Sequence, residues 1–69
     1  MSVLKVIELM SESPKSWEDA AQQAVAKAAK TVKNVRSLWV KEFAASVANG
    51  KIATYRVTCK VTFEVKDKP

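Results

Sequence analysis

The sequence predicts a two-layer α+β domain, in which one helix covers one face of a three-stranded antiparallel sheet. Three observations predict this fold. A run rich in β-branched residues (VLKVIEL) occupies residues 3–9, a helical period occupies residues 11–34, and an alternation of period two occupies residues 35–66. The predicted order is strand–helix–strand–strand, and the 69 residues form a single domain, residues 1–69.

The first predicted strand, residues 3–9, has an ambiguous orientation. Lys5 lies on one of its faces and Glu8 on the other, and both have apolar residues beside them on the same face. The alternation therefore leaves open which face of this strand packs on the helix.

The helix has two possible starts. Ser13 followed by Pro14 suits an N-cap and a first helical position, whereas Ser16 with Asp19 resembles a capping box. Acidic residues lie in the first turns and lysines in the last turns, which suits the helix dipole. A mostly alanine stripe predicts close packing on the sheet, and its members are Trp17, Ala21, Ala24, Val25, Ala28 and Val32.

The last two strands are predicted to form a long hairpin around Asn49-Gly50, the residue pair that a type I′ turn prefers. Leu38 and Val40 face the helix from the second strand, and Cys59 is interpreted as a small core residue of the third. The helix-facing residues predicted for the third strand are Tyr55, Val57, Cys59, Val61, Phe63 and Val65.

The opposite face of the sheet needs a separate explanation, because one helix covers only one face. This face is predicted to carry the large rings of Trp39 and Phe43 among basic residues. A lone domain that exposed both rings would tend to aggregate, so we expect an interface or a ligand site. The predicted members of this face are Ser37, Trp39, Lys41, Phe43, Arg56, Thr58 and Lys60.

The composition argues against several functional classes. The chain has no histidine, and Gly50 is its single glycine, so acid–base catalysis and a glycine-rich phosphate loop lack their usual residues. We therefore expect no enzyme, and no catalytic or metal-binding residue is predicted. A single cysteine forms no intrachain disulfide, and a structural zinc site lacks its ligands. Since a chain of this size is marginally stable alone, oligomerisation is the expected source of stability.

The charge pattern does not favour a nucleic-acid partner. The net charge is +5, but the twelve basic residues are spread from Lys5 to Lys68, as on an ordinary solvated surface. The sequence has neither a run of about 20 apolar residues nor a signal-peptide pattern in residues 1–13. With a single thiol, these features predict a cytoplasmic protein without a membrane partner.

Taken in order, six segments resemble the dodecin family, and together they cover nearly the whole chain. The resemblance implies a β-α-β-β fold whose sheet partly wraps around the helix, and a hollow homododecamer. The segments are KVIEL (5–9), the entry Ser13-Pro14, EDAAQQAVAKAAKTVKNV (18–35), SLWVKEF (37–43), the turn Asn49-Gly50 and TYRVTCKVTFEV (54–65).

The resemblance also implies a ligand. Many dodecins store or scavenge flavins. The flavin ring stacks on a tryptophan of the second strand, and a glutamine of the third strand forms a hydrogen bond with the edge of the ring. In an ungapped comparison these two positions fall on Ser37 and Arg56, so neither role is carried over. Trp39 lies on the same strand face as Ser37, two residues further on, and keeps a shifted stacking position open. Other members are calcium-binding dodecins, but this face offers lysine and arginine where calcium needs carboxylate oxygens.

Two hypotheses follow. In the first, the protein is a store that sequesters a flavin (FMN, FAD or riboflavin) or a related nucleotide such as coenzyme A. Its candidate binding residues are Trp39, Ser37, Arg56 and Lys41, with Arg56 pairing with a phosphate or stacking on the ligand.

In the second hypothesis, the protein is a structural dodecameric shell whose remodelled pocket holds ions or another ligand and no flavin. Trp39 and Phe43 then anchor neighbouring subunits. Arg56 is then expected to pair with an acid of a neighbour, such as Glu42 or Glu64.

Overall fold

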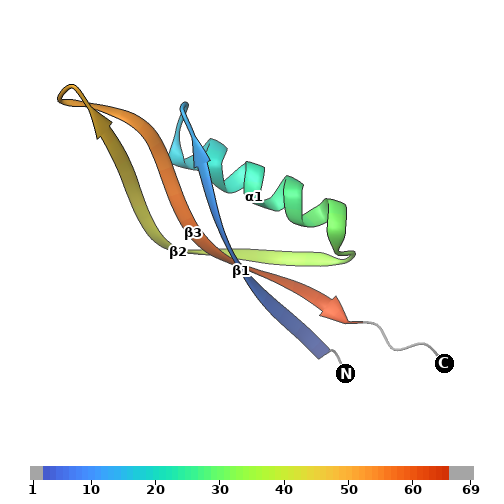
Figure 1. Ribbon diagram of the computed structural model, residues 1–69. Coiled ribbons are helices and arrows are strands. Elements are labelled where there is room, and N and C mark those ends of the chain that lie inside the picture. Colours follow the sequence, from blue (N-terminus) through green and yellow to red (C-terminus); the bar gives the residue numbers. More distant parts are fainter. Residues whose placement is uncertain (1–2, 66–69) are drawn as a thin grey trace.

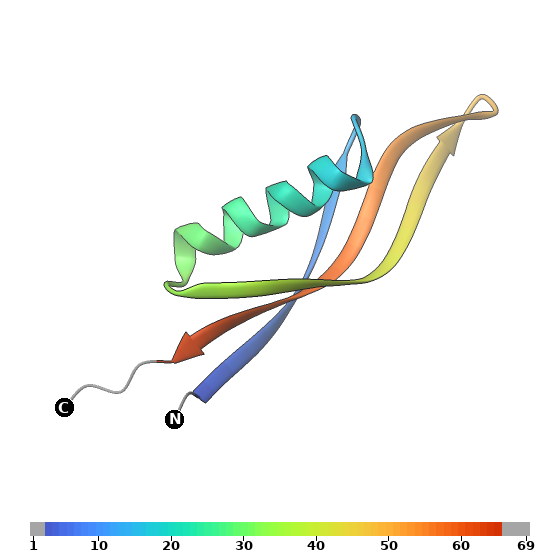
Figure 2. The same cartoon turned by 180° about the vertical axis from the view of Figure 1, so that it is seen from behind.

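The computed structural model describes residues 3–65, and these residues have the predicted element order. Strand β1 (Val3–Ser13) leads into helix α1 (Trp17–Thr31), which is followed by strands β2 (Val35–Ala48) and β3 (Lys51–Val65). The sheet order is β1-β3-β2, and both strand pairs are antiparallel. Figure 1 and Figure 2 show a curved sheet with α1 along its concave side and the tip of the β2–β3 hairpin extending past the start of the helix. The predicted α+β fold is confirmed.

The core lies between α1 and the centre of the sheet. Alanine side chains bring the helix backbone close to the sheet, so that a thin core with small residues is sufficient. Ala24 and Ala28 of the predicted stripe are buried, and Ala20, which the stripe did not include, is fully buried as well. The cluster at the centre joins Ala20, Ala24, Val57 and Cys59, with Leu9, Trp17, Leu38 and Val40 packed around it.

The helix begins at the second of the two predicted starts. Ser16 is the N-cap, and its Oγ accepts a hydrogen bond from the Asp19 backbone N–H at 2.9 Å. Ser13 is not a cap, since it is the last residue of β1 and is buried. Its hydroxyl donates to Asp19 Oδ2 at 2.6 Å and accepts from the Lys15 N–H at 2.9 Å, which fixes the connection between strand and helix.

Strand β1 is longer than predicted, and its orientation is now defined. It continues to Ser13 because Ser11, Glu12 and Ser13 pair with Val57, Arg56 and Tyr55 of β3. Leu9 packs on the helix, whereas Glu8 and Met10 lie on the opposite face of the sheet and are exposed.

Strand β2 contains a β-bulge that the sequence pattern did not predict. The register with β3 shifts between Val40 and Glu42, so that Lys41 has no directly paired residue. Before the bulge, Trp39 pairs with Lys60; after it, Phe43 pairs with the buried Val57. One extra residue reverses the alternation, and the prediction that Phe43 shares a face with Trp39 is therefore wrong.

The hairpin turn agrees with the prediction. Asn49 and Gly50 have φ angles of 54° and 76°, both in the left-handed region that a type I′ turn requires. Nothing lies within 4 Å of the position where a side chain at Gly50 would begin, so the glycine serves the backbone conformation and not a close contact.

Candidate functional site

The face of the sheet opposite α1, called the outer face below, carries most of the polar and charged side chains of the sheet. Within residues 3–65, no other helix or strand covers it (Figure 1). Strand register places residues from all three strands on this face, in rows that cross the sheet. These residues include Leu4, Val6, Glu8, Met10 and Glu12 from β1; Arg56, Thr58, Lys60, Thr62 and Glu64 from β3; and Ser37, Trp39 and Glu42 from β2.

Trp39 is the one aromatic side chain among these outer-face residues, and 61% of it is exposed. Its cross-strand neighbour Lys60 places its Nζ 5.5 Å from the centre of the indole ring. At this distance the ammonium group is attracted by the electron-rich face of the ring. The outer face therefore presents an aromatic plane with a cation beside it.

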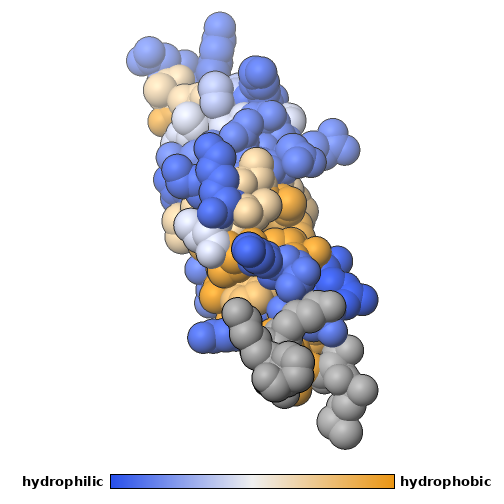
Figure 3. Space-filling view, turned by 90° about the vertical axis from the view of Figure 1, so that its right-hand side faces the viewer, coloured by the Kyte–Doolittle hydropathy of each residue, from blue (hydrophilic) through white to orange (hydrophobic). Residues whose placement is uncertain are grey.

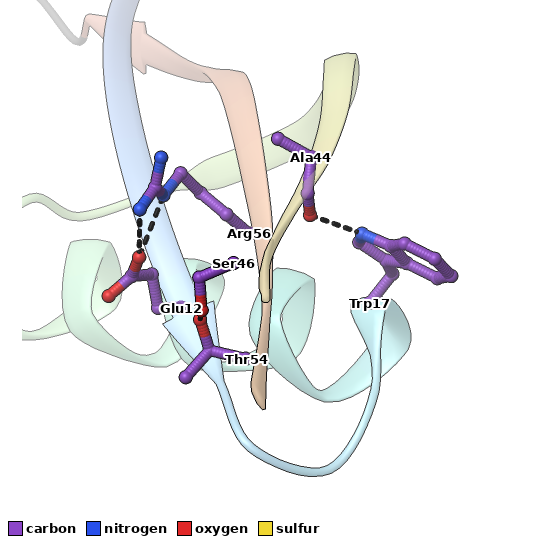
Figure 4. Close-up of polar contacts among 6 residues, drawn as sticks. All are labelled: Glu12, Trp17, Ala44, Ser46, Thr54 and Arg56. Carbon is purple, nitrogen blue, oxygen red and sulfur yellow. Dashed lines mark hydrogen bonds and ion pairs between the residues drawn. The ribbon is translucent and has the colours of Figure 1, made fainter. Parts of the chain in front are cut away.

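Arg56 is held by an acid of its own chain. Its Nε donates to Glu12 Oε2 at 2.7 Å, and Nη2 lies 2.5 Å from the same oxygen (Figure 4). The two residues are directly paired between β1 and β3, which explains the contact. Within the single chain the partner of Arg56 is therefore Glu12, and a contact with Glu42 or Glu64 of a neighbouring subunit stays a prediction.

Lys41, at the bulge, is also paired with an acid of β1. Its Nζ lies 3.3 Å from Glu8 Oε2, so the side chain reaches across β3 on the outer face. Ser37 lies opposite Thr62 and is exposed, on the same face as Trp39. The structure therefore places all four predicted site residues (Trp39, Ser37, Arg56 and Lys41) on the outer face, with both predicted cations in ion pairs.

Phe43 belongs to an aromatic cluster on the helix side of the sheet. The ring of Trp17 meets Tyr55 edge-on at 4.8 Å and Phe43 at 6.1 Å between centroids. Trp17 Nε1 donates to the Ala44 carbonyl at 2.9 Å (Figure 4), which ties the start of α1 to β2 just after the bulge. Although 62% of Phe43 is exposed, its ring is turned away from Trp39, and the two rings do not form one platform.

The thiol of Cys59 lies in the core and not on the outer face. Cys59 is fully buried, and burial raises the pKa of its thiol, so it is a poor nucleophile. Within residues 3–65 no group of three or more His, Cys, Asp or Glu side chains is placed to hold a metal ion. The same part of the single chain encloses no pocket and contains no helix long and apolar enough to cross a membrane.

Sequence reasoning did not include Lys60 among the site residues, although it placed this lysine on the correct face. The observation that identifies Lys60 is its cross-strand pairing with Trp39. That pairing depends on the number of bulges between the turn and Trp39, which the alternation alone does not give.

The β-α-β-β order, with one helix on the concave side of a three-stranded antiparallel sheet, defines a small two-layer α+β domain. The family profile named Dodecin matches residues 3–66. The chain therefore belongs to the dodecin family.

Relatives with two different descriptions are similar to this chain. The calcium dodecin of Mycobacterium tuberculosis is 39% identical over 66 residues, which cover 96% of this chain and 93% of that protein. A crystal structure of that calcium dodecin, described as calcium chelating and as having a novel calcium-binding site, covers 99% of both chains at 41% identity with a TM-score of 0.80.

The dodecin of Thermus thermophilus is less similar in sequence and more similar in shape. The crystal structure of one of its arginine-to-alanine mutants is 31% identical and covers 97% of this chain and 100% of that chain, with a TM-score of 0.92. Of these two relatives, the calcium dodecin has the higher sequence identity and the Thermus thermophilus dodecin the more similar backbone.

Proposed function

We propose that this dodecin is a non-enzymatic store that sequesters a flavin (FMN, FAD or riboflavin), or a related nucleotide such as coenzyme A, in a homododecameric shell. In this proposal the planar ring of the ligand stacks on Trp39. The observation that carries it is the indole of Trp39 on the outer face, which is 61% exposed. An indole in such a position stabilises a stacked planar ring by about 1–3 kcal/mol, by analogy with nucleobase stacking.

The apolar surface of the single chain supports assembly into a shell. Nine large apolar side chains within residues 3–65 are at least 40% exposed. Figure 3 shows apolar surface gathered in the lower half of that view, below a mostly polar upper half. A soluble single chain rarely leaves this much apolar surface in water, so other subunits are expected to cover it. Besides Trp39 and Phe43, the exposed residues are Val3, Leu4, Val6, Met10, Val47, Ile52 and Val65.

Assembly also bears on ligand binding, because the described part of one chain encloses no pocket. Ligand sites usually bury most of the ligand surface. A ring stacked on Trp39 of one chain has one face covered, and its second face is expected to be covered by a neighbouring subunit or a second ligand. The proposal therefore requires the assembled protein for tight binding.

Calorimetric titration of riboflavin, FMN and coenzyme A into ligand-stripped, assembled protein tests the proposed function. We expect saturable binding of a flavin to the wild-type protein. Trp39→Ala is expected to weaken it by a factor of about 5 to 150, which corresponds to a stacking energy of about 1–3 kcal/mol. Trp39→Phe is expected to retain part of the affinity, because a smaller ring remains.

Trp17→Phe is the matched control, because this second tryptophan lies on the helix side of the sheet and packs on Tyr55. It is expected to leave flavin affinity unchanged. Gel filtration shows whether each variant still assembles. If Trp39→Ala disrupts the assembly, Trp39 is a subunit anchor; if the assembled Trp39→Ala protein binds flavin as well as the wild type does, the stacking role is wrong.

A second candidate function is calcium binding by the same kind of shell. The similarity to the calcium dodecin of Mycobacterium tuberculosis, 39% identity over 96% of this chain, favours it. The carboxylates of Glu8 and Glu12 on the outer face are, however, each paired with a cation, and calcium prefers six to eight oxygen ligands. The same calorimetric experiment with calcium chloride decides between the two: calcium binding without flavin binding would replace the proposed function by this one.

A further inference from the structure

The outer face carries several cationic side chains, and three of them are paired with acids: Arg36 with Glu64, Lys41 with Glu8 and Arg56 with Glu12. Arg56 is paired with Glu12, and Lys41 with Glu8, at the distances given above. Both acids belong to β1, so the two pairs fix these cations toward that edge of the sheet. An anionic group that approached either cation would have to displace a carboxylate of the protein first.

Lys60 differs from these three ion-paired cations. Within residues 3–65 its ammonium group forms no ion pair, and its contact is with the ring of Trp39. Glu8 is its directly paired residue on β1, but the recorded contact of the Glu8 carboxylate is with Lys41. Lys60 is therefore the cation of this face that is available for a new anionic partner, and it is placed within a few ångströms of the proposed stacking surface.

We infer that Lys60 is the residue that selects the charge of the ligand, so that the site prefers planar aromatic compounds with a phosphate or another anionic group over the uncharged compound with the same ring. This inference rests on the proposed function and deepens it. A ring that stacks on Trp39 either displaces the Lys60 ammonium from the indole or lies beside it. In both cases the ammonium remains close to the ligand and is partly removed from water, which strengthens its attraction to an anion.

The inference also reassigns a role. Sequence reasoning assigned the phosphate contact to Arg56, whose guanidinium group is suited to phosphate. The Glu12 pair occupies two of its nitrogen donors in the structure. Lys60, with a flexible side chain and three N–H donors that make no recorded hydrogen bond within residues 3–65, replaces it in this role.

The test compares riboflavin with FMN, which share one ring system and differ by a phosphate that is close to doubly charged at neutral pH. Calorimetry on the assembled protein at low salt gives the ratio of the two dissociation constants. We expect the wild-type protein to prefer FMN about fivefold, which corresponds to about 1 kcal/mol. Lys60→Met keeps the aliphatic stem and is expected to bring the ratio to about one, while riboflavin affinity changes little.

Arg56→Gln is the matched control, because it removes a cation from the same strand and the same face. It is expected to leave the preference for FMN in place. A preference that survives Lys60→Met, or one that is lost in Arg56→Gln, would overturn the assignment. If neither flavin binds, the proposed function fails, and the same titrations with adenosine and adenosine monophosphate test Lys60 separately: a monophosphate preference that Lys60→Met abolishes supports its role, and any other result overturns it.

Discussion

At the scale of single residues, the cations of the outer face differ in whether an acid of the same chain is paired with them. Arg36, Lys41 and Arg56 are paired with Glu64, Glu8 and Glu12, whereas the Lys60 ammonium lies over the Trp39 ring. Exposed ion pairs of this kind stabilise a fold by about 1 kcal/mol or less. In the proposed function their larger effect is on specificity, because Lys60 is then the cation beside Trp39 that a ligand is expected to use.

Neither of the ion pairs with β1 could be predicted from the sequence. Glu12 and Arg56 are 44 residues apart, and their contact depends on the register between β1 and β3. The predicted strand ended at residue 9, so Glu12 was not considered a residue of the sheet. Serine and glutamate have low strand propensity, and tertiary pairing overrides that preference in residues 11–13.

Cys59 provides a prediction at the residue scale that depends on pH. Its buried thiol has a raised pKa in the folded protein, so the unfolded chain loses this proton at a lower pH than the folded chain. The contribution of Cys59 to stability is therefore fully present below the ordinary thiol pKa of about 8.5 and falls as the pH rises above it. Denaturant unfolding at pH 7.5 and pH 10 is expected to show this decrease, and Cys59→Ala, compared with the wild type, is expected to show a smaller one. An identical decrease in both proteins would contradict the assignment.

At the scale of elements, the bulge at Lys41 determines what each face of β2 presents. An unbroken alternation from Ser37 to Phe43 would place Glu42 on the helix side and Phe43 on the outer face, and the extra residue at Lys41 exchanges the two. Leu38 and Val40, before the bulge, were placed correctly on the helix side. Phe43, after it, was not. The bulge separates the ring that packs on Trp17 from the ring that remains available on the outer face.

The start of α1 gives a second prediction at this scale. Ser16 Oγ accepts the Asp19 N–H, so Ser16→Ala is expected to lower the free energy of unfolding by about 1 kcal/mol. Ser16→Thr keeps an accepting hydroxyl and is expected to recover most of this loss. Both values come from chemical denaturation followed by circular dichroism. Equal destabilisation by alanine and threonine would show that the cap does not account for the effect.

At the scale of the whole molecule, the single chain has the shape of a part of an assembly. Its radius of gyration is 14.4 Å, whereas a compact domain of this length has about 11 Å. Its accessible surface is 5287 Å², compared with about 4,300 Å² for a compact monomeric protein of 7.6 kDa. The order and type of the elements were predictable from local patterns. The surfaces that subunits share were predictable only as an excess of apolar residues, because the partner is not encoded in any local pattern.

This excess predicts the mass of the protein in solution. Light scattering coupled to gel filtration is expected to give about twelve times the chain mass of 7.6 kDa. Val47→Lys together with Ile52→Lys, which adds charge to exposed apolar residues at the hairpin end, is expected to reduce this mass. A wild-type mass near that of one chain would contradict the shell.

The most direct test of ligand storage on Trp39 is a fluorescence titration of FMN with ligand-stripped, assembled protein. Stacking brings the flavin into contact with the exposed indole, so we predict saturable quenching of flavin fluorescence at micromolar protein and its loss in Trp39→Ala. Flavin fluorescence that stays unchanged when the wild-type protein is in excess would contradict storage of flavin by this dodecin.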